Sequence, residues 1–582
     1  MTDNNAAGED PVAAEGTRDM AVDAFAPPAP YEIFGNDICV VEEKEGAGPL
    51  FVCSVLRVSA SFSDINGKGW GKLVSVRTRD GNWHDVPIKS EDLHCSPRAV
   101  IGSLVNHGLE IGAGKKAADH VVSLLRSWTP SSKLISVTRG GWVDESRSSF
   151  VMADKVFGAQ DVLALPQTSQ GPAVHLGAKG SIDEWKQSVG SKCIDNPLMQ
   201  LAVSLAFSGP LLPMASVEGL GLHFRGMSSS GKTTLLRVAA SVWGRPQLIT
   251  QWRATSNGLE AIAASLNNML LPLDEIAEIS AKELTNTIYM LANGLGKARM
   301  NRDTSIQEPS RWNLAVISSG EIGIEEKLAE ARVRLMEGQE VRLVDIDADC
   351  RNFGAFDTLH GATNAADFAD ALKAAAESTY GTVGQEFVRR LSGATGNIPQ
   401  IIATRARAFK DTATKGMNPL DAVAARVLHR FSVLSIAGEL ATAFGLTGWQ
   451  SGDSRNAALA AFADWHEGRV EDESVSVSDY VDQLLAFIDG HVSSFAEVGS
   501  VDLGGTPPGL RDDRHVYLSK ETWHEVFPGV RASEAAKALI KASLLAPGER
   551  GRHLKKLPRA ASTRTRMYTV PYPGLKEWKA SQ

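Results

Sequence analysis

The sequence predicts an α/β fold for residues 195–350, with a parallel sheet that carries helices on both faces. Apolar runs at 219–224, 269–273 and 314–318 predict strands, and segments with helical spacing separate them. This alternation of strand and helix is typical of parallel sheets, because each crossover between parallel strands is usually made by a helix. An α/β core is therefore expected in the middle of the chain.

The other parts of the chain differ from this block in composition. Residues 1–30 hold too few large apolar groups to offset the entropy of ordering and predict a disordered tail. Residues 31–190 begin with short β-branched and aromatic runs between turn residues and predict a β-rich N-terminal domain. Residues 351–470 are Ala-rich with helical spacing and predict a helical subdomain. Residues 475–582 have the order of a winged-helix-like C-terminal domain.

Bulk properties exclude several classes of protein. The chain has 582 residues and a formal net charge of −8, so any contact with nucleic acid must come from local basic clusters. Its five cysteines form no C-x-x-C pair and favour free thiols over a zinc site. The sequence shows neither a secretory start nor a run of roughly 18 apolar residues, so a cytoplasmic protein without membrane contact is expected.

A phosphate-binding pattern follows the first predicted strand. Residues 226–233 fit G-x-x-x-x-G-K-[ST], with an apolar strand before them and helical spacing at 234–242. Glycines let consecutive backbone N–H groups turn toward phosphate oxygens, while the start of the helix presents its positive end to the same anion. The nucleotide is expected to contact Gly226, Met227, Ser228, Ser229, Ser230, Gly231, Lys232, Thr233 and Thr234.

Four side chains have predicted roles in the chemistry of ATP. Lys232 is expected to reach the β- and γ-phosphates, and the Thr233 hydroxyl is expected to bind Mg²⁺. The second predicted strand ends in Asp274 and Glu275. Asp274 would hold the Mg²⁺ shell, and Glu275 would polarise the attacking water. Alone, two acids at a strand end are more often solvated charges, but after a phosphate loop they predict hydrolysis.

Two further residues are candidates for sensing or completing the site. Ser319 ends the third predicted strand, where a small polar side chain could bind the γ-phosphate or the lytic water; a plain turn explains it equally well. Arg342, at the start of another predicted strand, could reach the γ-phosphate of a neighbouring subunit. A surface salt bridge is the alternative for Arg342, and Arg334 is a second candidate for the same role.

Basic residues between the second and third strands predict contact with nucleic acid. The alternation of Lys297, Arg299 and the residues around Arg302 puts cations on one face of an extended segment, and residues 303–310 can turn it into a hairpin. Such a hairpin suits a phosphate backbone, although a solvated hairpin is the alternative. A second basic cluster at 550–566 suits duplex binding by a wing or merely solvates the C-terminus.

Six segments, in their order along the chain, resemble the domain-of-unknown-function family nine-two-seven, the AAA+ helicase-like proteins of phages, prophages and other mobile elements. They are residues 223–234, 252–260, 273–276, 292–299, 312–321 and 338–342. The members resemble hexameric minichromosome-maintenance and superfamily-three helicases. The resemblance therefore implies an AAA+ P-loop core, a pore hairpin that grips single-stranded DNA, and Arg342 as the arginine finger.

Residues and resemblance together predict an ATP- and Mg²⁺-dependent DNA helicase or translocase. It would be a homo-oligomer, a hexameric ring, that acts on single-stranded or forked DNA in the replication of a phage or other mobile element. Residues 31–190 hold no clustered acids for primer synthesis, so a primase or replication initiator is an expected partner. The alternative is a switch ATPase of signalling or defence, which oligomerises on ATP without translocating.

Overall fold

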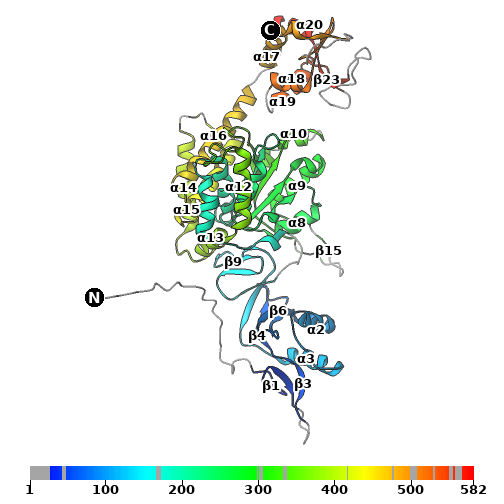
Figure 1. Ribbon diagram of the computed structural model, residues 1–582, viewed down its shortest axis with the longest axis vertical. Helices are drawn as coiled ribbons and strands as arrows, with labels where there is room; N and C mark the ends of the chain where they lie inside the picture. The colour runs from blue at the N-terminus through cyan, green and yellow to red at the C-terminus, as the bar shows by residue number, and fades with distance from the viewer. Residues whose placement is uncertain are drawn as a thin grey trace, which may run out of the picture.

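The computed structural model describes residues 26–41, 48–165, 172–297, 299–300, 306–307, 309–331, 337–415, 417, 419–474, 477–498, 508–527, 531–548, 555–556 and 566–581. An N-terminal, a central and a C-terminal unit follow one another along the longest axis (Figure 1). Buried apolar side chains form three clusters, within residues 31–128, 142–462 and 480–575. Each unit therefore has its own hydrophobic core.

The N-terminal unit contains two β-sheets and three helices. A small antiparallel sheet precedes a larger one of order β11-β7-β4-β5-β6, and α1 to α3 contribute to the same core. The elements are β1 (Tyr31–Phe34), β2 (Asp37–Val40), β3 (Leu50–Ser54), β4 (Leu56–Ser63), β5 (Gly71–Arg77), β6 (Trp83–Lys89), α1 (Ser90–Cys95), α2 (Pro97–Asn106), α3 (Lys115–Ser127), β7 (Lys133–Val137) and β11 (Val162–Ala164).

The hydrophobic core changes inside the range 31–190. Trp128 belongs to the N-terminal cluster, whereas Trp142 belongs to the central one and donates its indole N–H to the Pro210 carbonyl (2.9 Å). Trp142 lies in a small sheet formed by β8 (Gly141–Trp142), β9 (Ser149–Met152) and β10 (Lys155–Gly158). The helices α4 (Ile182–Trp185) and α5 (Ser191–Cys193) also contribute to the central cluster.

A five-stranded parallel sheet forms the middle of the central unit. Its order is β13-β14-β17-β12-β18, with every neighbouring pair parallel. The strands are β12 (Leu220–Arg225), β13 (Thr250–Gln251), β14 (Leu270–Asp274), β17 (Ala315–Gly320) and β18 (Leu343–Asp347). Parallel strands with helical cover are buried on both faces, which explains the continuous apolar runs in the sequence. The predicted parallel α/β sheet is confirmed.

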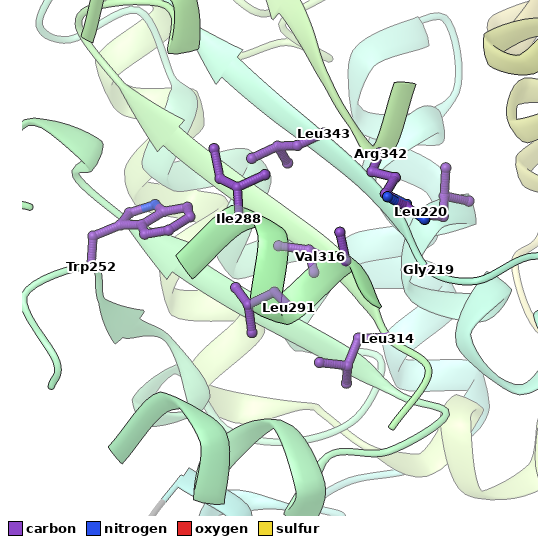
Figure 2. A pocket seen from close by; sticks show the side chains of 10 residues that line it. Gly219, Leu220, Trp252, Ile288, Leu291, Leu314, Val316, Arg342 and Leu343 are labelled. Carbon is purple, nitrogen blue, oxygen red and sulfur yellow. The ribbon is translucent and has the colours of Figure 1, made fainter. Parts of the chain in front are cut away.

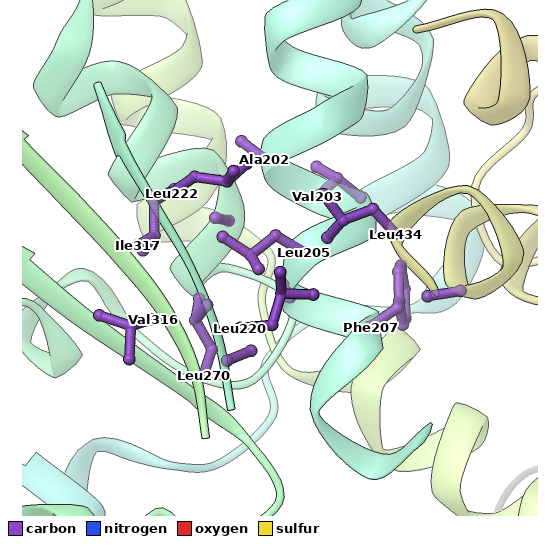
Figure 3. Close-up of a cluster of buried hydrophobic side chains, with 14 of the residues drawn as sticks. Ala202, Val203, Leu205, Phe207, Leu220, Leu222, Leu270, Val316, Ile317 and Leu434 are labelled. Carbon is purple, nitrogen blue, oxygen red and sulfur yellow. The ribbon is translucent and has the colours of Figure 1, made fainter. Parts of the chain in front are cut away.

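Helices cover both faces of this sheet. Figure 3 shows side chains of α6 between the strands and Leu434 of α15, while Ile288 and Leu291 of α9 lie with Leu314 and Val316 near the other face. The helices before and between the strands are α6 (Pro197–Ser208), α7 (Lys232–Ala240), α8 (Ser256–Ser265), α9 (Ala281–Asn293), α10 (Ile324–Ala329) and α11 (Glu337–Arg342).

Helices follow β18 and lead to the C-terminal unit. They are α12 (Ala365–Ser378), α13 (Thr382–Ser392), α14 (Ile398–Ala413), α15 (Ala422–Ala443) and α16 (Asp453–Ser474). The C-terminal unit consists of α17 (Val477–Gly490), β19 (Ala496–Glu497), β20 (Gly509–Arg511), β21 (His515–Leu518), α18 (Lys520–Val526), α19 (Arg531–Lys541), β22 (Lys555–Lys556), β23 (Arg566–Pro571) and α20 (Tyr572–Ser581). Among the residues described, no helix combines the length and apolar character needed to cross a bilayer.

Candidate nucleotide site

Residues 226–231 connect β12 to α7 at the carboxyl edge of the sheet. Gly231 is the N-cap of α7 and has a φ of +97°, a conformation that side chains disfavour. A Cβ on Gly231 would also lie 2.8 Å from the Phe356 ring, so both backbone and space require glycine. Open α/β sheets bind ligands outside the carboxyl ends of their strands. The phosphate-loop pattern therefore lies where such a ligand is expected.

Lys232 contacts the loop that precedes it. Its side chain is buried, and Nζ donates to the carbonyls of Gly226 (2.8 Å) and Met227 (2.5 Å) and to Ser230 Oγ (3.3 Å). A phosphate would replace these neutral acceptors with charged ones, which form stronger hydrogen bonds. Of the other predicted contacts, Thr233 is half-buried and Thr234 is buried, while Met227, Ser228 and Ser229 are exposed.

The register of the sheet brings Asp274 to the same edge as the loop. Leu273 of β14 pairs with Ser318 of β17, which pairs with His223 of β12. Asp274, the next residue, is therefore two strand spacings, or about 10 Å, from the end of β12. Asp274 is half-buried and accepts a hydrogen bond from the Ser319 hydroxyl. The structure thus brings both predicted residues close to the phosphate loop.

Glu275 turns the chain away from β14. Its φ is +57°, in the left-handed region, and its carboxylate accepts the Ala277 N–H (3.3 Å) at the start of a short 3₁₀ turn. Its own N–H donates to Ser319 Oγ (3.5 Å). Ser319 therefore links the side chain of Asp274 to the backbone of Glu275. In this conformation Glu275 caps a turn.

A buried polar network, which the sequence pattern did not indicate, lies on the opposite face of β17. The Ser318 hydroxyl accepts from Trp252 Nε1 (2.8 Å) and lies 2.8 Å from His223 Nδ1. His223 Nε2 lies 3.0 Å from the Ile322 carbonyl, which can only accept. We assign the proton to Nε2 on this basis, so the neutral ring accepts from Ser318 at Nδ1. A histidine in an apolar strand is the signal that could have indicated this network.

Acidification is expected to destabilise the central unit through His223. Burial lowers the pKa of His223 below 6.5, so between pH 7.5 and 5.5 the unfolded chain binds the proton more readily than the folded one. Stability then falls by at most about 1.4 kcal/mol per pH unit below the unfolded pKa. Hydrogen exchange of the β12 amides at pH 7.5 and 5.5 should show this loss in the wild type and a smaller loss in His223→Gln.

Asp345 has the opposite effect on the pH dependence of stability, so its substitution provides a check on the role of His223. It lies 4.0 Å from His223, and burial raises its pKa above 3.8, so its contribution to stability increases as the pH falls. Asp345→Asn should therefore steepen the acid loss. Equal pH dependence in the wild type and in His223→Gln would contradict the role assigned to the ring.

A segment after β18 is hydrogen-bonded to the phosphate loop. The sequence analysis did not identify this segment. The Met227 N–H donates to Asp349 Oδ2 (2.5 Å), and the Ala355 N–H donates to the Ser230 carbonyl (2.8 Å). Asp349 and Lys232 thus hold the two ends of the Met227 residue, its N–H and its carbonyl. No local motif shows these contacts, because more than a hundred positions separate Asp349 from Met227.

Arg342 lies at the opposite edge of the sheet. It ends α11 rather than beginning a strand, and β18 starts at Leu343. Figure 2 shows Arg342 beside Gly219 and Leu220, around an apolar pocket near the strand starts. Leu343 pairs with Gly221, so Arg342 is six residues, or about 20 Å, from the start of its own phosphate loop. This distance excludes a contact between Arg342 and the phosphate loop of the same chain.

The surroundings of Arg342 are cationic. Its Nη2 forms an ion pair with Glu218 (3.2 Å), which is the predicted alternative of a salt bridge. Burial, and then the charges of Arg342 and Arg426, lower the pKa of Arg430 to about 10. Arg334, the other candidate for this role, lies outside the described residues. An anion brought to this edge would meet concentrated positive charge.

The basic segment pairs as a hairpin. β15 (Arg299–Met300) and β16 (Ile306–Gln307) are antiparallel, with Arg299 opposite Gln307. Lys297 is exposed and its Nζ donates to Ser256 Oγ (3.2 Å) at the start of α8, while Arg302 lies outside the described residues. In Figure 1, β15 lies at the end of the central unit nearer the N-terminal unit, and α10 lies at the other end.

Among the described residues, no three His, Cys, Asp or Glu side chains gather to hold a metal ion. Thr233 and Asp274 supply only one carboxylate. Mg²⁺ is commonly held by one or two carboxylates together with substrate phosphates and waters. The residues present therefore fit a magnesium ion that arrives with a nucleotide, rather than one bound permanently.

Residues 37–311 match the family described as Domain of unknown function (DUF927). The DUF927 match includes the phosphate loop, Asp274, Glu275 and Lys297, and it ends before Ser319 and Arg342. It covers the first four of the six segments named in the sequence analysis and ends before the last two, 312–321 and 338–342. No curated protein sequence matches the chain significantly.

One solved structure is similar over most of the chain. It is titled "SCCmec type IV Cch - active helicase", with a TM-score of 0.59 and 20% identity over 94% of this chain and 99% of that one. The C-terminal region of NrS-1 gives a TM-score of 0.23 at 11% identity, over 67% and 87% of the two chains. NtrX from Brucella abortus in complex with ATP gives 0.18 at 14%, over 51% and 63%. The first of these shows a shared fold.

Proposed function

We propose that this protein is an ATP-driven DNA helicase or translocase with an AAA+ P-loop core, which forms a ring and acts in the replication of a phage or other mobile element. The observation that carries the proposal is the loop at 226–233, at the same sheet edge as Asp274 and Glu275. The fold shared with a structure titled as an active helicase, over nearly the whole of both chains, supports it.

Residues at the carboxyl edge of the sheet have separate roles in ATP hydrolysis. Backbone N–H groups of the loop and the start of α7 bind the phosphates, and Lys232 leaves the carbonyls of Gly226 and Met227 to join them. Thr233 and Asp274 would hold Mg²⁺, which would supply positive charge to the phosphate oxygens. Glu275 leaves its cap at Ala277 and orients the attacking water, and Ser319 responds to the loss of the γ-phosphate.

Arg342 serves the site of a neighbouring copy in this proposal. Arg342 is about 20 Å from the phosphate loop of its own chain, so the phosphate that it contacts must be bound by a second subunit. Arg342→Ala is expected to lower ATP turnover at least about a hundredfold, because a fixed positive charge at the γ-phosphate contributes strongly to phosphoryl transfer. Glu218→Gln, which removes only the ion-pair partner, is the matched control and should stay within about twofold of wild type.

Mixing two inactive variants tests whether the site is shared. A ring of equal parts Lys232→Ala and Arg342→Ala contains interfaces in which an intact lysine faces an intact arginine, about a quarter of the total. ATP turnover should therefore return to roughly that fraction of the wild-type rate. A mixture as inactive as its components, from rings shown to be mixed by native mass measurement, would contradict the shared site.

The function itself is tested by strand displacement. Forked DNA, ATP and Mg²⁺ are combined with the protein, and native mass measurement counts the subunits. We expect displacement that requires hydrolysis, and turnover that single-stranded DNA stimulates. Slow turnover that is indifferent to single-stranded DNA, without displacement, would instead support an oligomeric switch. The same assay with an added primase or replication initiator tests the expected partner.

A further inference from the structure

Residues 351–356, a turn segment after β18, carry an exposed aromatic ring next to the phosphate loop. Two isolated bridges define its overlapping turns: Arg351 pairs with Gly354, and Phe353 pairs with Phe356. The Phe353 N–H donates to the Phe356 carbonyl (2.8 Å), and the Arg351 N–H donates to the Gly354 carbonyl (3.1 Å). The backbone of residues 351–356 is therefore defined by its own hydrogen bonds.

This turn segment is fixed to the phosphate loop. The Ala355 N–H donates to the Ser230 carbonyl (2.8 Å), and a Cβ on Gly354 would lie 2.6 Å from that same oxygen. Gly354 also has a φ of +71°, so both its conformation and this close approach require glycine. Phe356, only 1% exposed, packs against Gly231. The turn segment and the phosphate loop are thus in direct contact.

A second attachment joins the turn segment to α16. Arg351 Nη2 forms an ion pair with Asp464 of α16 (2.5 Å), and the Arg351 side chain is largely buried. The turn therefore has little freedom to move away from the loop. Phe353 lies within this turn, so its position relative to the phosphates is set by the same contacts.

Phe353 differs from Phe356 in its exposure. Its exposed fraction is 44%, although it lies between two anchored residues. Consecutive Cα atoms are about 3.8 Å apart, so Phe353 lies within roughly 10 Å of the Ser230 carbonyl through Gly354. A single exposed aromatic residue is common on protein surfaces. Its place beside the loop is the informative feature, since ribose and base extend outward from phosphates bound there.

We propose that Phe353 stacks on the base of the nucleoside triphosphate whose phosphates lie on residues 226–233. This inference rests on the proposed function. It names a residue that contacts the base, whereas residues 226–233 contact the phosphates. An aromatic ring contributes through area and π-stacking, which every nucleobase accepts. Phe353 therefore strengthens binding of nucleotides in general, and it discriminates them from inorganic polyphosphate.

Calorimetric titration with two ligands tests the proposal. Full-length wild type and Phe353→Ala are each titrated with ATP and with inorganic tripolyphosphate, in the presence of Mg²⁺. The variant should bind ATP about tenfold more weakly and tripolyphosphate unchanged. Phe353→Trp should restore ATP affinity, because it restores the stacking surface. Tyr289→Ala on α9, which removes a ring that is 61% exposed, is the control and should leave both affinities unchanged.

Each other outcome overturns the inference. Unchanged ATP affinity in Phe353→Ala would remove the ring from the site. Equal weakening of ATP and tripolyphosphate would show that Phe353 acts through the shape of the loop. A change in subunit count by native mass measurement, with ATP affinity per subunit unchanged, would place the ring in an interface between copies. Failure of the wild type to bind either ligand would overturn the proposed function as well.

Discussion

Lys232→Ala and Glu275→Gln are each expected to reduce ATP hydrolysis at least about a hundredfold, the contribution of a general base or more. They should differ in binding. Lys232→Ala removes a charge that would contact the phosphates, so nucleotide affinity also falls. Glu275→Gln removes only the group that orients the water, so ATP stays bound without turnover. Phosphate release and titration with a fluorescent nucleotide separate these effects.

Glu278 provides the matched control for the acidic residue. It lies in the same turn as Glu275 and is exposed. Glu278→Gln makes the same chemical change three residues further along, and its turnover should stay within about twofold of wild type. If Glu275→Gln hydrolysed ATP at the rate of Glu278→Gln, the assignment of Glu275 would be wrong. Retention of full affinity by Lys232→Ala would contradict the proposed phosphate contact.

Lys297→Ala is expected to uncouple hydrolysis from DNA. Lys297 lies at the base of the β15–β16 hairpin and at the sheet end remote from the phosphate loop, so basal ATP turnover should stay within about twofold. Stimulation by single-stranded DNA and strand displacement should fall about tenfold or more. The salt dependence of DNA binding should weaken by about one unit of slope for each subunit that contacts a phosphate.

Two controls separate this effect from a general loss of positive charge. Lys282→Ala removes an exposed cation at the start of α9, away from the hairpin. Ser256→Ala removes the hydroxyl that accepts from Lys297 Nζ in the free protein. Both variants should unwind DNA like the wild type. Normal unwinding by Lys297→Ala would remove the hairpin from the mechanism.

The sequence was informative where a function depends on neighbouring residues. The phosphate-loop pattern, its flanking strand and helix, and the acids at the end of β14 are local signals, and the parallel sheet followed from the alternation of strand and helix. Asp274 and Ser319 are adjacent because their strands are parallel neighbours that end at the same edge of the sheet. Their chemical roles remain predictions, to be tested by the variants above.

Contacts across long stretches of chain could not be predicted in the same way. The bonds from Asp349 to Met227 and from Ala355 to Ser230 depend on how the chain turns after β18, which no spacing pattern describes. The change of core between Trp128 and Trp142 was hidden for a related reason. Both sides of that boundary contain short strands, and only packing shows which core each tryptophan joins.

The two serines near the end of β17 are hydrogen-bonded on opposite faces of the strand, next to the acidic residues of the site. Successive strand residues point to opposite faces, so Ser319 contacts Asp274 while Ser318 is held from behind by Trp252 and His223. Preorganised groups of this kind need little rearrangement when charge develops in a transition state. The groups that must move when a nucleotide binds are then Lys232, which exchanges loop carbonyls for phosphate oxygens, and Glu275, which leaves its cap at Ala277.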